Sequence, residues 1–255
     1  MLETTTAGKF KYFESKGEGD VLLLLHGLFG ATSNFSGVID AFGKSHNVVI
    51  PILPIYELPL LKVSLTGLLE YVEEFVNFKG FPKVHILGNS LGGHLSLLYA
   101  LKCPERVQTM ILTGSSGLYE SGMGNTFPKR SDYNFIKAKT EATFYRPETA
   151  TKELVDEVYD IVNDRMKAIR VLATAKSAIR HNVGDRLHEI KCPTLIIWGK
   201  EDTVTPAFVA DKFHSLIENT ELHIFDECGH APMWELPKQF NAVLNSFLER
   251  HPVQL

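Results

Sequence analysis

Short apolar runs alternate with amphipathic stretches along most of the chain. The apolar runs have the length of strands, and strands are expected at residues 9–14, 21–25 ("VLLLL"), 47–53 ("NVVIPIL"), 83–87, 107–113, 194–198 and 221–225. Most of these runs contain few polar positions, which is typical of strands buried on both faces of a parallel sheet. The pattern therefore predicts a sheet covered by helices on both sides.

Helices are expected between these strands because apolar residues recur there at helical spacing. The predicted helices cover residues 33–44, 63–78, 91–102 and 206–218, followed by a last helix with Phe240, Val243, Leu244, Phe247 and Leu248 on one stripe. Strand and helix alternate almost throughout, which is the pattern of a doubly wound, mostly parallel α/β sheet.

The alternation breaks once, between about residues 117 and 186. No convincing strand is found there, but Gly117, Gly122 and Gly124 indicate a loop, and residues 148–163 and 164–180 have helical patterns. We interpret residues 1–116 and 187–255 as an α/β core. Residues 117–186 are expected to form a helical cap, or lid, inserted over one end of the sheet.

Composition and charge narrow the classes of function. Of the 255 residues, 44% are hydrophobic and 22% charged, with a formal net charge of −4 and no Lys/Arg-rich run, so neither nucleic acid nor an anionic membrane surface is an expected partner. The N-terminus lacks the features of a secretory signal, and no run is long enough to span a bilayer. Three widely separated cysteines argue against a disulfide framework or a zinc site. A cytoplasmic monomer or homodimer is expected.

One serine stands where a predicted strand turns into a predicted helix. Ser90 lies in "GNSLG", which matches G-x-S-x-G, the nucleophile elbow that exposes a serine hydroxyl at a sharp strand-to-helix turn. The motif alone is short enough to arise by chance, and Ser90 as a simple turn residue is the alternative. Its place after a strand and before a helix favours the nucleophile.

A serine nucleophile needs a base, and the base needs an acid that orients it. His230, in "FDECGHAP", follows the strand at 221–225, and Asp202, in "GKEDTVTP", follows the strand at 194–198. Glu201 and Asp226 are the competing acids. The chain order Ser90, Asp202, His230 is that expected on an α/β-hydrolase scaffold.

The tetrahedral intermediate needs two N–H donors. The Leu91 amide follows the nucleophile at a helix N-terminus, and the loop "HGLFG" supplies a second donor, for which Leu28 is preferred and Phe29 is the alternative. In the same loop His26 is expected to be structural. Cys228 does not lie in a nucleophile elbow and is expected to be a buried packing residue.

These motifs together resemble the α/β-hydrolase fold family, specifically single-domain members with a helical cap. The resemblance rests on "HGLFG", "GNSLGG", "GKEDTVTP" and "GHAPMWELP" and covers nearly the whole chain. The spelling "GNSLGG" looks like that of serine-dependent C–C hydrolases, which cleave vinylogous diketones, and "HGLFG" looks like that of small acyl esterases. The chain departs from the family after the second parallel strand, where "PILPIYELPLLKVS" replaces the usual D-x-P-G-x-G-x-S loop.

We therefore expect a serine hydrolase, carboxylesterase-like, that cleaves an ester or thioester of a small, partly apolar acyl compound without a metal or organic cofactor. C–C bond hydrolysis by the same residues is the enzymatic alternative, and a ligand-binding receptor on the same fold is the non-enzymatic one. An apolar acyl pocket would be lined by aromatic residues, although such residues also serve as ordinary core packing. The candidates are Phe29, Phe127, Phe144, Tyr145 and Trp234, with Trp198 as a further one.

Overall fold

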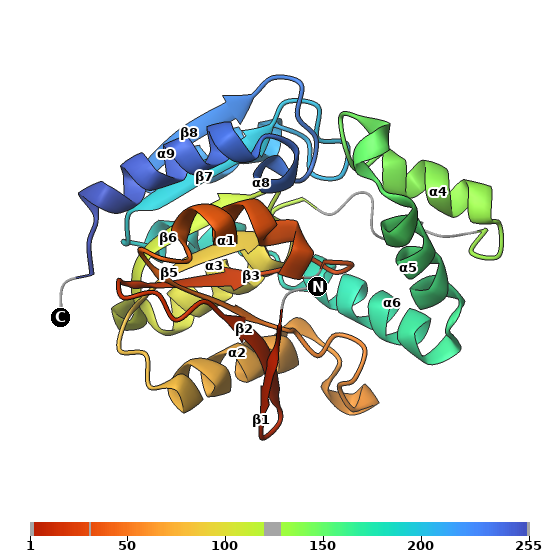
Figure 1. Ribbon diagram of the computed structural model, residues 1–255, viewed down its shortest axis with the longest axis horizontal. Helices are drawn as coiled ribbons and strands as arrows, with labels where there is room; N and C mark the ends of the chain where they lie inside the picture. Colours follow the sequence, from red (N-terminus) through yellow and green to blue (C-terminus); the bar gives the residue numbers. More distant parts are fainter. Residues whose placement is uncertain (1–2, 31, 120–128, 254–255) are drawn as a thin grey trace.

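The computed structural model describes residues 3–30, 32–119 and 129–253. In these residues eight strands form one sheet in the order β1-β2-β4-β3-β5-β6-β7-β8 (Figure 1). The strands are β1 (Thr5–Ala7), β2 (Phe10–Glu14), β3 (Val21–Leu25), β4 (Asn47–Pro51), β5 (Val84–Asn89), β6 (Val107–Thr113), β7 (Thr194–Gly199) and β8 (Thr220–Phe225). β1 and β2 pair antiparallel, as do β2 and β4, and all other pairs are parallel. The predicted doubly wound, mostly parallel sheet is confirmed.

Helices connect the parallel strands, and two more follow the last strand. They are α1 (Ser36–Phe42), α2 (Leu65–Lys79), α3 (Leu91–Lys102), α4 (Tyr133–Glu141), α5 (Lys152–Asn163), α6 (Arg165–Arg180), α7 (Phe208–Leu216), α8 (Pro232–Glu235) and α9 (Pro237–Arg250). Short 3-10 turns lie at η1 (Thr32–Phe35), η2 (Leu60–Lys62), η3 (Pro104–Arg106), η4 (Pro147–Thr149) and η5 (Gly184–Glu189).

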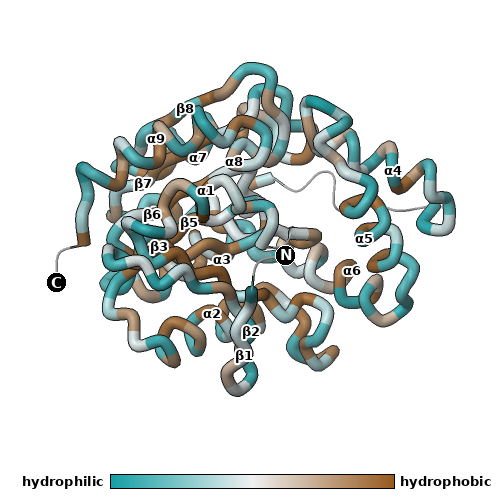
Figure 2. The backbone as a smooth tube through the Cα atoms, in the orientation of Figure 1, coloured by the Kyte–Doolittle hydropathy of each residue, from teal (hydrophilic) through white to brown (hydrophobic). Residues whose placement is uncertain are grey.

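The sheet separates two hydrophobic cores, and β3 shows how. Because successive side chains of a strand point to opposite faces, Leu23 and Leu25 pack with residues of α2, α3 and α7, while Leu22 and Leu24 pack with residues of α1 and α9. All four leucines are fully buried. In Figure 2 the segments around β3 and α3 are largely brown, in keeping with a sheet that is covered on both faces.

Most predicted elements are present with shifted ends. The strand expected at 47–53 stops at Pro51, and the helix expected at 33–44 is a 3-10 turn followed by the shorter α1. The helix expected at 63–78 begins only after Ser64, whose hydroxyl accepts a hydrogen bond from Gly67 N and caps it. Three elements escaped prediction: β1 has only three residues, α8 is a single turn, and α4 buries only Ile136 and Thr140 and so lacks a clear apolar stripe.

The helices α4, α5 and α6 are inserted between β6 and β7. Figure 1 shows them beyond the ends of the strands toward which the arrows point. Ile136, Val158 and Val162, from α4 and α5, form a small apolar cluster of their own. The segment predicted as a cap therefore lies at the carboxyl end of the sheet, where ligands bind in open α/β sheets.

Candidate active site

Ser90 occupies a strained turn between β5 and α3. Its φ of 56° and ψ of −118° lie in a region that non-glycine residues rarely adopt. Its amide donates to Thr113 O at 3.1 Å, and its carbonyl accepts from the amides of His94 and Ser116, each at 3.2 Å. These backbone bonds hold the turn in place against its strain.

The glycines around Ser90 allow the helix to return close to the sheet. A Cβ on Gly88 would lie 2.3 Å from Gly92 O, and a Cβ on Gly92 would lie 1.9 Å from Leu25 O. Both contacts are with backbone atoms, which cannot move aside as the end of a flexible side chain could. Gly88 and Gly92 of "GNSLGG" are therefore required by the packing of α3 against β3 and β5.

The imidazole of His230 and the carboxylate of Asp202 are in contact and buried. His230 Nδ1 lies 2.8 Å from Asp202 Oδ2. The Asp202 side chain is fully buried and that of His230 is 8% exposed. Asp202 follows β7 and His230 follows β8, and these strands are neighbours in the sheet. The structure brings together the two residues predicted as acid and base.

Asp202 is held by further donors that the sequence analysis missed. Its Oδ1 accepts from the amides of Val204 at 2.8 Å and Thr205 at 2.9 Å, and its Oδ2 accepts from Thr205 Oγ1 at 2.9 Å. Thr205 is itself anchored because Trp198 Nε1 donates to its carbonyl at 2.8 Å. The quoted motif "GKEDTVTP" contained Thr205, but no pattern distinguished its hydroxyl from an ordinary turn residue.

The competing candidates have other partners. Glu201 Oε2 accepts from Cys228 N at 3.0 Å, and Asp226 pairs with Lys200 at the surface. The Cys228 thiol is fully buried, and this burial raises its pKa well above the ordinary value. Its placement agrees with the expected role of packing.

The His230 loop is fastened to the strand ends near Ser90. Asn89 Nδ2 donates to Thr113 O at 3.1 Å and to His230 O at 3.0 Å, so the residue preceding the serine ties β5 to β6 and to the histidine. A Cβ on Gly114 would lie 2.8 Å from His230 Nδ1. The imidazole therefore packs directly on the backbone that follows β6, beside the turn that carries Ser90.

The predicted oxyanion loop runs along Ser90. A Cβ on Gly27 would be 3.2 Å from Ser90 Cβ. The Gly27 carbonyl accepts from Gly30 N at 3.1 Å and lies 2.8 Å from His26 Nδ1. Because the peptide is trans, the Leu28 N–H points away from this turn. Leu91 is the first residue of α3, where an amide has no partner within the helix.

His26 holds this loop in the way expected from the sequence. Its Nε2 accepts from Leu53 N at 3.0 Å, so Nδ1 carries the proton that is donated to Gly27 O. Burial of the ring lowers its pKa. The neutral imidazole therefore bridges the loop after β3 and the loop after β4.

Tyr56 lies in the segment that departs from the family pattern. Its hydroxyl donates to Leu28 O at 2.6 Å, and burial raises its pKa well above the ordinary value. The proline-rich segment that follows β4 thus supplies a side chain that supports the predicted oxyanion loop.

The aromatic candidates for a pocket are dispersed. Phe29 packs against the apolar cluster of α4 and α5. Phe144 and Trp234 pack edge to face, 5.3 Å apart, within the core on the α1 and α9 side of the sheet. Tyr145 is 41% exposed, and Phe127 lies outside the described residues. The structure does not bring the described candidates into one group. Trp198 is fully buried against Phe213 in the core.

The inserted helices meet the predicted site through backbone atoms. Thr143 O accepts from His230 N at 2.9 Å, and Ala142 O accepts from Thr203 Oγ1 at 2.7 Å. Tyr145 N donates to Glu235 Oε2 at 2.8 Å, while Glu235 Oε1 accepts from Gly229 N at 3.0 Å. The segment that follows α4 is therefore fastened directly to the histidine loop.

Two further properties of the described residues concern metal ions and membranes. No cluster of three or more His, Cys, Asp or Glu that would suit a metal ion occurs in them. None of the helices in that part of the chain is long and apolar enough to cross a bilayer.

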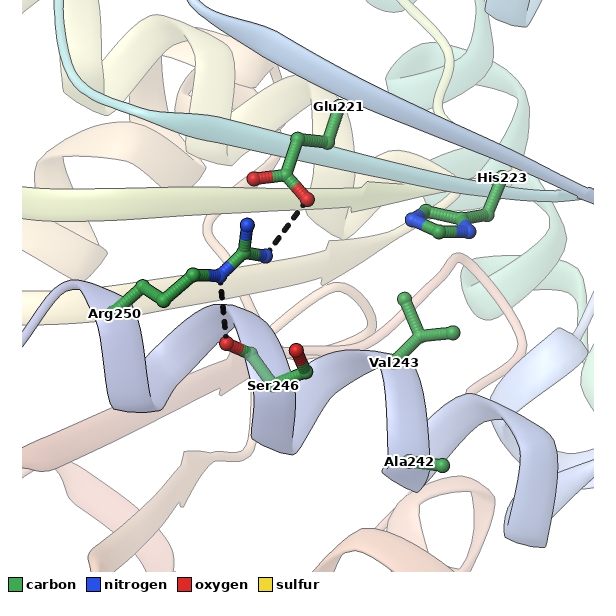
Figure 3. Close-up of a pocket in the computed structure, with 6 residues that line it drawn as sticks. All are labelled: Glu221, His223, Ala242, Val243, Ser246 and Arg250. Atoms are coloured by element: carbon green, nitrogen blue, oxygen red, sulfur yellow. Dashed lines mark hydrogen bonds and ion pairs between the residues drawn. The ribbon is translucent and has the colours of Figure 1, made fainter.

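A hollow of about 290 Å³ lies between β8 and α9, lined by Glu221, His223, Ala242, Val243, Ser246 and Arg250 (Figure 3). These residues do not include any of the predicted catalytic groups.

A family model described as the alpha/beta hydrolase family matches residues 22–243. The chain belongs to the alpha/beta hydrolase family. It is 44% identical to an alpha/beta hydrolase enzyme of known structure from the metagenome of sediments of the lagoon of Mar Chica, Morocco, with a TM-score of 0.81 over 97% of this chain and 98% of that one.

Two curated relatives of this alpha/beta hydrolase are named for their substrates. A 2-hydroxy-6-oxononadienedioate/2-hydroxy-6-oxononatrienedioate hydrolase of Escherichia coli strain K12 is 31% identical over 98% of this chain and 95% of its own length. A 2-hydroxy-6-oxo-6-phenylhexa-2,4-dienoate hydrolase of Comamonas testosteroni is 28% identical over 94% of this chain and 91% of its own length. The chain is accordingly a hydrolase of this family.

Proposed function

We propose that this hydrolase uses Ser90, His230 and Asp202 as a catalytic triad and cleaves a C–C bond in a 2-hydroxy-6-oxo-dienoate. The observation that carries the triad is the buried 2.8 Å contact between His230 Nδ1 and Asp202 Oδ2, formed beside the strained Ser90 turn. The type of bond is supported by the curated relatives, which match nearly the whole chain and carry the names of such hydrolases. C–C bond hydrolysis, the alternative in the sequence analysis, thus takes the place of ester or thioester cleavage as the preferred activity.

His230 would serve as the base through its remaining nitrogen. Because Nδ1 is committed to Asp202, Nε2 is left to take the proton of the Ser90 hydroxyl. Among the described residues no hydrogen bond joins Ser90 Oγ to His230, and such bonds are often long without substrate and tighten when it binds. The Leu28 and Leu91 amides would hold the oxyanion.

The proposed reaction follows from the chemistry of these substrates. The keto tautomer of a 2-hydroxy-6-oxo-dienoate carries ketones at C2 and C6. Ser90 Oγ attacks C6 and gives its proton to His230, and the C5–C6 bond then breaks. The electron pair moves from C5 to the C2 oxygen, which takes the proton from His230 and gives a 2-hydroxydienoate. Water hydrolyses the acyl group left on Ser90 to a carboxylic acid.

Residues 117–186 would act as the cap over this site. In support, α4, α5 and α6 lie at the carboxyl end of the sheet and are fastened to the His230 loop. Phe29 is the best placed of the aromatic candidates for a pocket, since it follows Leu28 and contacts the cluster of α4 and α5.

Ester or thioester hydrolysis remains the second candidate. It is favoured by the loop "HGLFG", which looks like that of small acyl esterases. The same triad and oxyanion donors would attack an ester carbonyl, with an alcohol or thiol in place of the carbon leaving group.

The test compares both substrates on wild type and Ser90→Ala. The wild type is expected to bleach the coloured dienolate of 2-hydroxy-6-oxo-6-phenylhexa-2,4-dienoate and release benzoate, with kcat/KM at least about tenfold above that on p-nitrophenyl esters from acetate to dodecanoate. Ser90→Ala should lose both activities. A preference for esters would restore the second candidate. Ligand binding without turnover by either protein would favour the receptor.

A further inference from the structure

The helix α6 has a charge composition unlike that of the whole chain. Between Arg165 and Arg180 it contains no acidic residue. Its cationic residues are Arg165, Lys167, Arg170, Lys176 and Arg180. The net charge of −4 conceals this local excess of positive charge. At the start of the helix the carboxylate of the N-cap Asp164 accepts hydrogen bonds from the amides of Met166 and Lys167.

The side of α6 that faces solvent is largely apolar. Arg165, Ile169, Leu172, Lys176 and Ile179 follow one another at intervals of four, three, four and three residues, so they lie along one stripe of the helix. Ile169 is 40% exposed, Leu172 49% and Ile179 45%. A surface helix normally turns such residues inward. Here the inner side of α6 is filled by other residues, including Val171, Ala175 and Ala178.

Two more exposed leucines lie on the neighbouring 3-10 turn η2. Leu60 is 50% exposed and Leu61 is fully exposed. The segment around η2 runs beside α6, because Arg170 Nε donates to Leu58 O at 2.9 Å and Leu65 N donates to Ser177 Oγ at 3.0 Å. We call the six exposed apolar residues of this surface the α6 face: Leu60, Leu61, Met166, Ile169, Leu172 and Ile179.

We propose that the α6 face docks the protein on an anionic lipid surface. A helix that combines bulky apolar residues with Lys and Arg on its exposed side can lie in the interface of a bilayer, with the apolar side chains below the headgroups and the cations near the phosphates. Arg165, Lys176 and Arg180 accompany the α6 face and are themselves exposed. Binding of this kind requires no membrane-spanning segment.

A second copy of α6 would be a poor occupant of the α6 face. Because α6 has no acidic residue, Arg165 and Lys176 would meet no carboxylate of the second α6 in such a contact. The ion pair of α5 joins Lys152 to Asp156 within that helix, and among the described residues none joins α5 to α6. An anionic lipid surface satisfies the cations and covers the apolar side chains together.

Another side of helix α6 lies near the predicted oxyanion loop. Lys167 Nζ lies 5.9 Å from the ring centre of Tyr56, and the Tyr56 hydroxyl donates to Leu28 O in the predicted oxyanion loop. Lys167 is not part of the α6 face, so a docked α6 face would leave this contact undisturbed. The inference is independent of which bond the enzyme cleaves.

The experiment measures sedimentation of the full chain with vesicles of three parts phosphatidylcholine to one part phosphatidylglycerol, and with vesicles of phosphatidylcholine alone. The partition coefficient should be at least about tenfold higher on the anionic vesicles and should fall in about 0.5 M NaCl, which screens surface charges. Leu172→Ser/Lys176→Glu should reduce partition about tenfold. The matched control Leu216→Ser/Lys238→Glu, with an exposed leucine and lysine on α7 and α9, should bind like the wild type.

Equal partition on both kinds of vesicle, or unchanged binding by Leu172→Ser/Lys176→Glu, would overturn the proposal. Light scattering provides a second arm: a wild-type dimer that the same substitutions convert to a monomer, without vesicle binding, would show that the α6 face joins two copies instead. Hydrolysis by the variant confirms that it is folded. Vesicle binding by a wild type that hydrolyses neither test substrate would contradict the proposed function and leave the lipid proposal standing.

Discussion

Thr205 Oγ1 donates a hydrogen bond to the same oxygen of Asp202 that contacts His230. The two distances are 2.9 Å from Thr205 Oγ1 and 2.8 Å from His230 Nδ1 to Asp202 Oδ2. The amides of Val204 and Thr205 occupy the other oxygen. The carboxylate is therefore fixed in its orientation by four donors, and Thr205 is a positioning residue for the proposed triad.

Thr205→Val should lower kcat/KM by roughly tenfold and leave the fold intact. Valine keeps the shape of threonine but removes one of the two donors to Asp202 Oδ2, so the carboxylate orients His230 less well. Thr205→Ser restores the hydroxyl and is the matched control. Steady-state kinetics and thermal unfolding of both variants make the test. Equal loss of activity in the serine variant would assign the effect to packing.

Asp202→Asn should reduce kcat/KM by roughly 10³ to 10⁴-fold. The asparagine side chain retains the approximate shape but neither bears the charge nor favours the imidazole tautomer that leaves Nε2 free to accept a proton. Asp226→Asn is the control, because Asp226 pairs with Lys200 at the surface and should retain near-normal activity. Comparable losses in the two variants would remove Asp202 from the proposed role.

Ser90→Gly should abolish activity and stabilise the fold by about 1 kcal/mol relative to Ser90→Ala. The positive φ of Ser90 is costly for any residue with a Cβ and costs glycine little. Both variants lack the hydroxyl, so their difference in free energy of unfolding in urea isolates the backbone strain. An alanine variant at least as stable as the glycine variant would show that the turn stores no such strain.

Acidification should destabilise the fold through His94. This ring is fully buried on α3, where its Nε2 donates to His181 O at 2.8 Å, and burial lowers its pKa to about 4. The unfolded chain has the higher affinity for the proton, so stability is fully present above about pH 6.5 and is lost as the pH falls toward 4.

The contribution of His94 amounts to a loss of about 2 kcal/mol near pH 5. His94→Gln keeps a donor near His181 O but does not titrate, so its free energy of unfolding should fall less than that of the wild type between about pH 7 and pH 5. Urea denaturation of both proteins at the two pH values makes the comparison. Parallel losses would exclude His94 as the source.

The sequence predicted the structure best where an apolar run was also a closely packed element of the sheet or of the helices that cover it. The "VLLLL" strand, the helix at 91–102 and the strand at 107–113 have the same bounds in the structure, because each is apolar and closely packed. Asp202 and His230 were found because parallel strands deliver their carboxyl ends to one edge of the sheet. Their pairing at 2.8 Å agrees with that argument.

Features that depend on three-dimensional contacts left no such pattern. Thr205 acts through one hydroxyl, and Tyr56 acts through a contact with Leu28 O across 28 positions of the chain. The short α4 has few buried residues and was missed. The positive charge of α6 was overlooked because its cations are spaced along a helix and averaged away in a total charge of −4.

The hydrogen bonds that hold the segment after α4 have a consequence for the substitutions that this segment tolerates. At the junction after α4, Ala142 O, Thr143 O and Tyr145 N make the contacts, while the core supplies Thr203, Glu235 and the backbone of His230. Backbone atoms are present whatever the side chain, so substitutions at these three positions of the inserted segment leave the bonds available. If the inserted segment acts as the proposed cap, its side chains at these positions can therefore change without removing the bond that holds the His230 backbone.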